Sequence, residues 1–144
     1  MAKLNLANMY IANKQLIESA GGGTDTGAKF KSGTFTSAAE QYGLSEIDCG
    51  FKPDLVIVSL PFTSGSTTND TTSYWWKDAS WAETSALWVL NPAENRTYVV
   101  TLGRETGETG IHTITDTGFK FMANGSNTRG VTCSYVAVQF PTEA

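Results

Sequence analysis

The sequence has few of the residues that form catalytic and metal sites, with one histidine and two cysteines in 144 residues. No group of ligand residues has the spacing of a metal site, and no serine lies in a Gly-x-Ser-x-Gly elbow. The glycines of residues 21–27 are not preceded by a strand and are not followed by the Lys-Ser or Lys-Thr of a phosphate loop. His112 sits in a Thr-rich segment and is interpreted as a surface or partly packed imidazole. We therefore expect no enzyme activity, no metal and no cofactor.

Charge is also scarce, and this argues against nucleic acid as a partner. Charged residues make up 17% of the chain, the net charge is −4, and the ten basic residues are scattered. Phosphate binding requires clustered lysine and arginine side chains. No stretch approaches the roughly 20 apolar residues of a membrane span. The first residues lack the apolar run of a signal peptide, so folding in a cytoplasm is expected.

Two cysteines are too few for a disulfide framework. Cys49 and Cys133 each fall inside a predicted strand. Buried free thiols are the favoured interpretation, because unpaired cysteine is among the most buried residue types. A disulfide joining the two strands is the alternative.

Two segments carry the strongest strand signals. Pro53 fixes its own φ and forces Lys52 into extended geometry, so no helix crosses this point. Residues 55–60 then form a short run rich in β-branched side chains, which predicts a central strand covered on both faces. Residues 131–140 form a second long strand, and its apolar second half again predicts cover on both faces.

Shorter strand candidates lie between and before these two. They are residues 30–37 (an edge strand), 44–49, 74–76, 86–90, 96–102, 112–115 and 118–122. Residues 63–72 are predicted to be a polar, mobile loop, and residues 124–130 have the Gly and Asn of a hairpin turn. The resulting seven to nine strands predict an all-β fold, an antiparallel β-sandwich of jelly-roll or H-type-lectin-like kind.

The first 27 residues differ from the rest, and we predict a division into an arm and tether (residues 1–27) and a β-sandwich domain (residues 28–144). The arm fits either a loosely amphipathic helix or an extended segment, followed by a Gly-rich tether. Its apolar side chains need cover, from its own domain or from another protein. The candidate attachment residues are Leu4, Leu6, Met9, Tyr10, Ile11, Leu16 and Ile17.

An aromatic cluster is the strongest recognition signal in the domain. Its members are Tyr74, Trp75, Trp76, Trp81 and Trp88. Adjacent residues of a strand point to opposite faces, so at most one of Trp75 and Trp76 faces the core. The cluster is therefore interpreted as core or loop cover, as a subunit interface, or as a platform for a sugar ring.

Three pieces of the sequence resemble a recurrent module of tailed-phage virion proteins, in which a short attachment segment precedes a sandwich similar to the H-type lectin fold. They are residues 50–58 (GFKPDLVIV), 117–121 (TGFKF) and 133–140 (CSYVAVQF). The resemblance implies a capsid decoration, head fibre or tail-fibre tip, a homotrimer, and a virion location after assembly in the host cytoplasm. It also implies other virion proteins as partners and host-surface adhesion as a role.

A stand-alone carbohydrate-binding module, with a cell-surface glycan as ligand, is the alternative. The sugar-contacting residues of H-type lectins have no counterparts that can be placed here. A glycosidase fragment using Asp78 and Glu83 is a weaker third interpretation.

Overall fold

The computed structural model describes residues 27–64, 66–80, 82–83, 85–90, 96–102 and 109–142, with the backbone alone at 64, 67, 69, 87–90 and 96–101. The described residues contain nine β-strands and no helix. The strands are β1 (Lys29–Thr36), β2 (Gly43–Asp48), β3 (Leu55–Ser64), β4 (Thr67–Trp76), β5 (Ser85–Leu90), β6 (Arg96–Thr101), β7 (Gly110–Ile114), β8 (Gly118–Ala123) and β9 (Thr132–Gln139). No helix capable of crossing a membrane occurs in this part of the chain.

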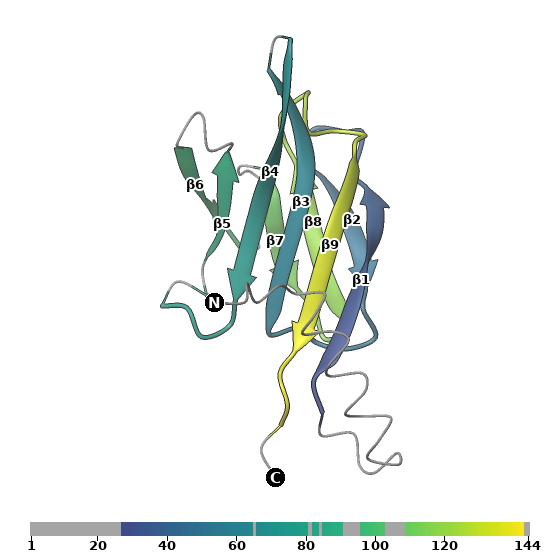
Figure 1. The fold of residues 1–144 in the computed structure, drawn as a ribbon, viewed down its shortest axis with the longest axis vertical. Coiled ribbons are helices and arrows are strands. Elements are labelled where there is room, and N and C mark those ends of the chain that lie inside the picture. The colour runs from purple at the N-terminus through teal and green to yellow at the C-terminus, as the bar shows by residue number, and fades with distance from the viewer. Residues whose placement is uncertain are drawn as a thin grey trace, which may run out of the picture.

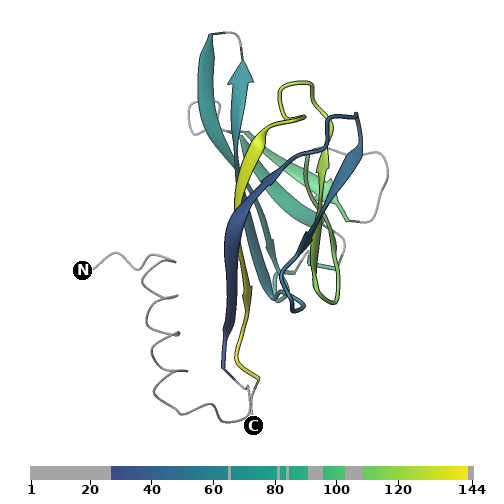
Figure 2. The same cartoon turned by 90° about the vertical axis from the view of Figure 1, so that its right-hand side faces the viewer.

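The strands form two antiparallel sheets that pack face to face (Figures 1 and 2). The large sheet has the order β1-β9-β3-β4-β5-β6, and the small sheet has the order β2-β8-β7. The predicted antiparallel β-sandwich is confirmed. β1 lies at an edge of the large sheet and β3 lies inside it, as the sequence predicts.

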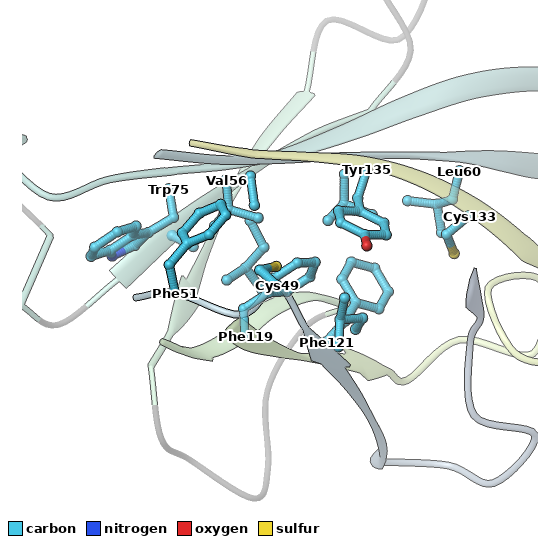
Figure 3. Close-up of a cluster of buried hydrophobic side chains, with 14 of the residues drawn as sticks. Cys49, Phe51, Val56, Leu60, Trp75, Phe119, Phe121, Cys133 and Tyr135 are labelled. Carbon is cyan, nitrogen blue, oxygen red and sulfur yellow. The ribbon is translucent and has the colours of Figure 1, made fainter. Parts of the chain in front are cut away.

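The core lies between the two sheets and is rich in aromatic rings (Figure 3). Phe35 of β1 meets Phe121 of β8 at a centroid distance of 5.5 Å, and Phe119 meets Tyr135 of β9 at the same distance. Both are edge-to-face arrangements, which contribute about 0.5–1.5 kcal/mol each beyond area burial. Cys49 and Cys133 are free and buried in this core, so the prediction of free thiols is confirmed.

The prediction that residues 55–60 are covered on both faces is wrong for one face. Val56, Val58 and Leu60 alternate into the core and are buried. Leu55 and Ile57 point to the opposite, outer face of the large sheet and are only half-buried. In β9 the outer face is covered only in part, because Val136 is half-buried whereas Val138 is 4% exposed. The small sheet covers only the inner face of the large sheet, as Figure 2 shows.

The predicted polar loop at residues 63–72 is also wrong. β3 continues to Ser64 and β4 begins at Thr67, so these residues form the end of a β-hairpin that projects beyond the other strands (Figure 1). The hydroxyl oxygens of Thr63 and Thr68 lie 2.9 Å apart across it. Threonine favours strands because its β-branch fits the pleat, and this preference prevails over the polarity of the segment.

Residues 124–130 do not form a hairpin between neighbouring strands, since β8 belongs to the small sheet and β9 to the large one. The segment crosses between the sheets and is held by buried hydroxyl groups. The Ser37 hydroxyl donates to the carbonyl oxygen of Thr128 at 2.7 Å and accepts from the Val131 amide at 3.0 Å. The hydroxyl oxygens of Thr109 and Thr128 lie 2.8 Å apart. These bonds satisfy polar groups that the crossover buries.

Residues 1–26 lie outside the described residues. The choice between helix and extended arm, the domain boundary at residue 28, and the seven candidate attachment residues therefore stay predictions.

Candidate functional site

The outer face of the large sheet carries an apolar surface that four strands build together. Residues directly opposite each other in neighbouring strands share a face, so the register defines its rows. The first row runs from β1 to β4 and consists of Phe30, Val138, Leu55 and Trp76. The second row lies two residues along each strand, and its apolar members are Val136, Ile57 and Tyr74. We call these seven residues the outer strip.

The outer strip ends abruptly along the strands. The next row on the same face consists of Thr34, Ser134, Ser59 and Thr72, all with hydroxyl side chains. Thr34 and Ser134 are exposed to solvent. In Figure 1 the small sheet lies behind, so this face of the large sheet is turned toward the viewer. The outer face is thus divided into an apolar end, near the start of β1 and the end of β9, and a hydroxyl-rich part.

The structure separates the two adjacent tryptophans, as the strand geometry predicts. Trp75 is 7% exposed and lies in the core, where its indole N–H donates to the carbonyl oxygen of Ala82 at 3.0 Å. Trp76 is 46% exposed and Tyr74 is 38% exposed, both on the outer strip. Trp75 is therefore a core residue, and of the three interpretations of the cluster, core cover applies to it.

The structure describes less of the other two tryptophans in the predicted cluster. Trp81 lies outside the described residues. Trp88 belongs to β5 and lies opposite Ser73 in the register, whereas Tyr74 lies opposite Leu87. Among the cluster side chains that the structure describes, Tyr74 and Trp76 are exposed and Trp75 is buried.

Asp54 fixes the border of the outer strip where β9 ends. Its carboxylate accepts a hydrogen bond from the Phe140 amide at 2.7 Å and lies 3.7 Å from the ammonium of Lys77. The Asp54 amide in turn donates to the carbonyl oxygen of Val138 at 2.7 Å. The Lys77 ammonium is 5.8 Å from the centroid of the Phe140 ring. One carboxylate therefore ties the ends of β4 and β9 to the turn before β3.

Within the described ranges, the side chains that could act in catalysis or bind a metal ion are not grouped together. His112 is buried at a β-bulge of β7, so it is not a surface imidazole, and its Nδ1 is 2.7 Å from the hydroxyl oxygen of Thr113. Asp78 and Glu83 are both exposed. No three His, Cys, Asp or Glu side chains of the described residues are grouped to hold a metal ion.

The two thiols are poor nucleophiles. Burial raises the pKa of Cys49 to about 11, with the neighbouring Asp48 carboxylate adding to the rise. Burial also raises the pKa of Cys133 to about 11. Thiolate is the reactive form of cysteine, so both side chains are protonated and unreactive near neutral pH.

Sequence reasoning found the exposed aromatic pair but missed most of the outer strip. The sequence does carry a signal for the strip, because both alternating sets of residues in 55–60 and 131–140 are apolar. This pattern predicts a strand covered on both faces, so it does not by itself indicate an apolar surface. Sequence reasoning also missed two other exposed residues, Tyr42 immediately before β2 and Leu44, the second residue of β2. Tyr42 has a φ of 62°, a left-handed conformation that is uncommon for a residue with a side chain.

No protein-family model matches the chain, and no curated protein matches it in sequence. Among solved structures, the chain is similar to the tailspike protein of Acinetobacter phage vB_ApiP_P1, with a TM-score of 0.30 and 13% sequence identity. The similarity covers 79% of this chain and 21% of the tailspike chain, so this chain spans about a fifth of that protein. A similarity of this size leaves the virion role of the chain a prediction.

Proposed function

We propose that this chain is a non-enzymatic structural protein of a bacteriophage virion. Residues 1–27 attach it to a capsid or tail protein, and residues 28–144 form the β-sandwich that the particle displays. The displayed domain is a homotrimer and serves in adhesion to the host surface.

The observation that carries this proposal is the outer strip. The sandwich already buries an aromatic core between its sheets, and it carries a second apolar set on the outer face of the large sheet. In this set Tyr74 and Trp76 are exposed and Val138 is buried. The remaining members are half-buried: Phe30, Leu55, Ile57 and Val136. Contiguous apolar surface on a soluble protein marks sites of contact with other molecules. An apolar segment at residues 4–17 precedes the same domain, so the chain has two surfaces suited to assembly.

Incorporation into particles tests the attachment. The apolar side chains of the arm are changed together in Leu6→Ser, Tyr10→Ser and Ile17→Ser, and the matched control changes polar residues of the same segment, Lys3→Ser, Lys14→Ser and Glu18→Ser. We expect the first variant to be missing from purified particles and the control to be incorporated. Normal incorporation of the first variant contradicts the attachment role.

A lectin-like function is the second candidate, and the exposed pair Tyr74 and Trp76 favours it. The two rings lie on the same face of β4, two residues apart, which is roughly 7 Å along a strand. Aromatic faces at such spacing stack on sugar rings. The hydroxyl groups of Ser59 and Thr72 lie in the next row and could accept or donate hydrogen bonds to a glycan.

A glycan array separates this candidate from a purely structural role. Trp76→Ala and Tyr74→Ala remove the proposed platform, and Leu44→Ala removes an exposed apolar residue in the other sheet as a control. Binding that is lost in the first two variants and kept in the control supports the lectin-like function. The absence of any binding by the unmodified chain excludes it for the glycans tested.

A further inference from the structure

The shape of the outer strip restricts what can cover it. Its two rows are separated by two residues along each strand, or roughly 7 Å, and it crosses four strands at a spacing of about 4.8 Å, or roughly 14 Å in all. The hydroxyl row of Thr34, Ser134 and Ser59 bounds it on one side. A broad partner packed flat on this face would also cover these hydroxyl groups, which then need new hydrogen-bond partners. The strip therefore favours a narrow occupant over a second sheet.

A single helix has the matching dimensions. An α-helix is about 10 Å wide and rises about 1.5 Å per residue, so one helix lying across the strands covers two rows at a time. Residues 4–20 span roughly 25 Å as a helix. When they are placed on a helical wheel, one face carries most of the apolar side chains of the segment: Leu6, Met9, Tyr10, Leu16, Ile17 and Ala20.

The connection to β1 places this segment within reach. The outer strip begins at Phe30, three residues after Gly27. Residues 21–27 have the sequence GGGTDTG, and an extended chain of this length spans roughly 24 Å. That reach exceeds the width of the strip, so the segment can cross from β1 toward Trp76 of β4. An intramolecular partner on a short flexible tether has an effective concentration in the millimolar range.

We propose that, in the free chain, residues 4–20 lie across the outer strip of their own domain as an amphipathic helix. The apolar side chains that attach the chain to its particle are then covered by Trp76, Ile57 and their neighbours before assembly. Attachment exchanges this intramolecular contact for the partner protein and uncovers the strip. The inference concerns the unassembled chain, so its test is independent of the virion assignment.

Thiol labelling of the full-length chain tests the inference. Ile57→Cys places a thiol in the second row of the outer strip, and Ser59→Cys places one in the hydroxyl row of the same strand. The native thiols are buried and have pKa values of about 11, so they react slowly. Val136→Cys is a second probe of the strip, on β9, for the case that Ile57→Cys folds poorly.

We expect the labelling rate at position 57 or 136 to rise about tenfold when Leu6→Ser, Tyr10→Ser and Ile17→Ser are added, with little change at position 59. The protection should be the same at low and high protein concentration. Protection that disappears on dilution means that a second copy covers the strip, and this overturns the inference. Equal labelling rates with and without the three serine substitutions overturn it as well.

Discussion

Leu55 and Trp76 lie directly opposite each other in β3 and β4, on the face of the large sheet that the small sheet does not cover. Their chain neighbours Val56 and Trp75 form the next pair of the same ladder, and both are buried in the core. Moving one residue along each strand therefore changes the position of the side chain from the core to the outer face. The position of Trp76 is therefore dictated by the burial of Trp75, and the exposed indole is a consequence of the strand register.

The two tryptophans should differ sharply in their effect on stability. Trp75→Phe removes the hydrogen bond to the Ala82 carbonyl and leaves a gap in the core, so we expect a loss of about 2–3 kcal/mol in the free energy of unfolding. Trp76→Phe should change it by less than about 0.5 kcal/mol. Urea unfolding of both variants measures the difference. Equal effects would mean that the assignment of the two faces is wrong.

Gly118 is a position where no side chain fits. A Cβ atom there would overlap the backbone carbonyl oxygen of Ile47 in the neighbouring strand. We expect Gly118→Ala to lower the free energy of unfolding by about 3–4 kcal/mol or to prevent folding, because a backbone atom cannot move aside. Gly130→Ala is the control: its Cβ meets nothing within 4 Å, and its positive φ of 65° costs only about 1–2 kcal/mol. Thermal unfolding ranks the two, and the reverse order contradicts the close approach of β8 to β2.

Asp54 should matter more than its partial exposure indicates. Asp54→Ala removes the acceptor of the Phe140 amide and the partner of Lys77, and we expect a loss of about 1–2 kcal/mol in the free energy of unfolding. Asp116→Ala is the matched control, because Asp116 is exposed and its carboxylate lies 3.9 Å from the ammonium of Lys52. That variant should unfold like the unmodified chain. A neutral Asp54→Ala would show that the end of β9 is held by other contacts.

The raised pKa values of the buried thiols predict that the free energy of unfolding falls at high pH. Burial raises the pKa of Cys49 and Cys133 to about 11, from the ordinary 9.0, and also raises the pKa of Tyr135 in the same core. Above pH 9 the unfolded chain loses the thiol protons that the folded chain keeps, so unfolding becomes easier as pH rises from about 9 to 11. Below pH 9 this contribution is complete. Urea midpoints measured at pH 8, 9.5 and 10.5 test the trend.

Substitution of both cysteines measures how much of this pH dependence comes from the thiols. In the double variant Cys49→Ala and Cys133→Ala, the fall in the urea midpoint between pH 9 and 10.5 should be smaller than in the unmodified chain. An unchanged slope would assign the pH dependence to other groups, with Tyr135 as the first to examine.

The sequence alone was sufficient to predict the β-sandwich, because the patterns that indicate strands and turns are local. They are the alternation in residues 118–122 and 131–140 and the turn at Pro53. It was insufficient for the strand order. Residues 63–72 look like a loop by polarity, yet pairing with β3 makes them a strand, and pairing is a long-range property. The crossover at residues 124–130 resembles a hairpin locally, and only the choice of sheet distinguishes the two.

The candidate site was predictable in part for the same reason. Adjacent Trp75 and Trp76 had to point to opposite faces, but which of them entered the core depended on the small sheet. The outer strip needs the register of β1, β9, β3 and β4 together, and no single segment of sequence contains it. An apolar set on each face of a strand predicts cover on both faces, whereas here the second cover must come from elsewhere.

Cross-linking of intact virions with a lysine-reactive reagent, followed by mass spectrometry, tests the central claim most directly. Lys3 and Lys14 lie in the arm, whereas Lys52, Lys77 and Lys120 lie in the domain. The account predicts cross-links from Lys3 or Lys14 to a different virion protein. If the chain is present in the particle but Lys3 and Lys14 are linked only to lysines of the same chain type, the arm does not attach it and the account is wrong.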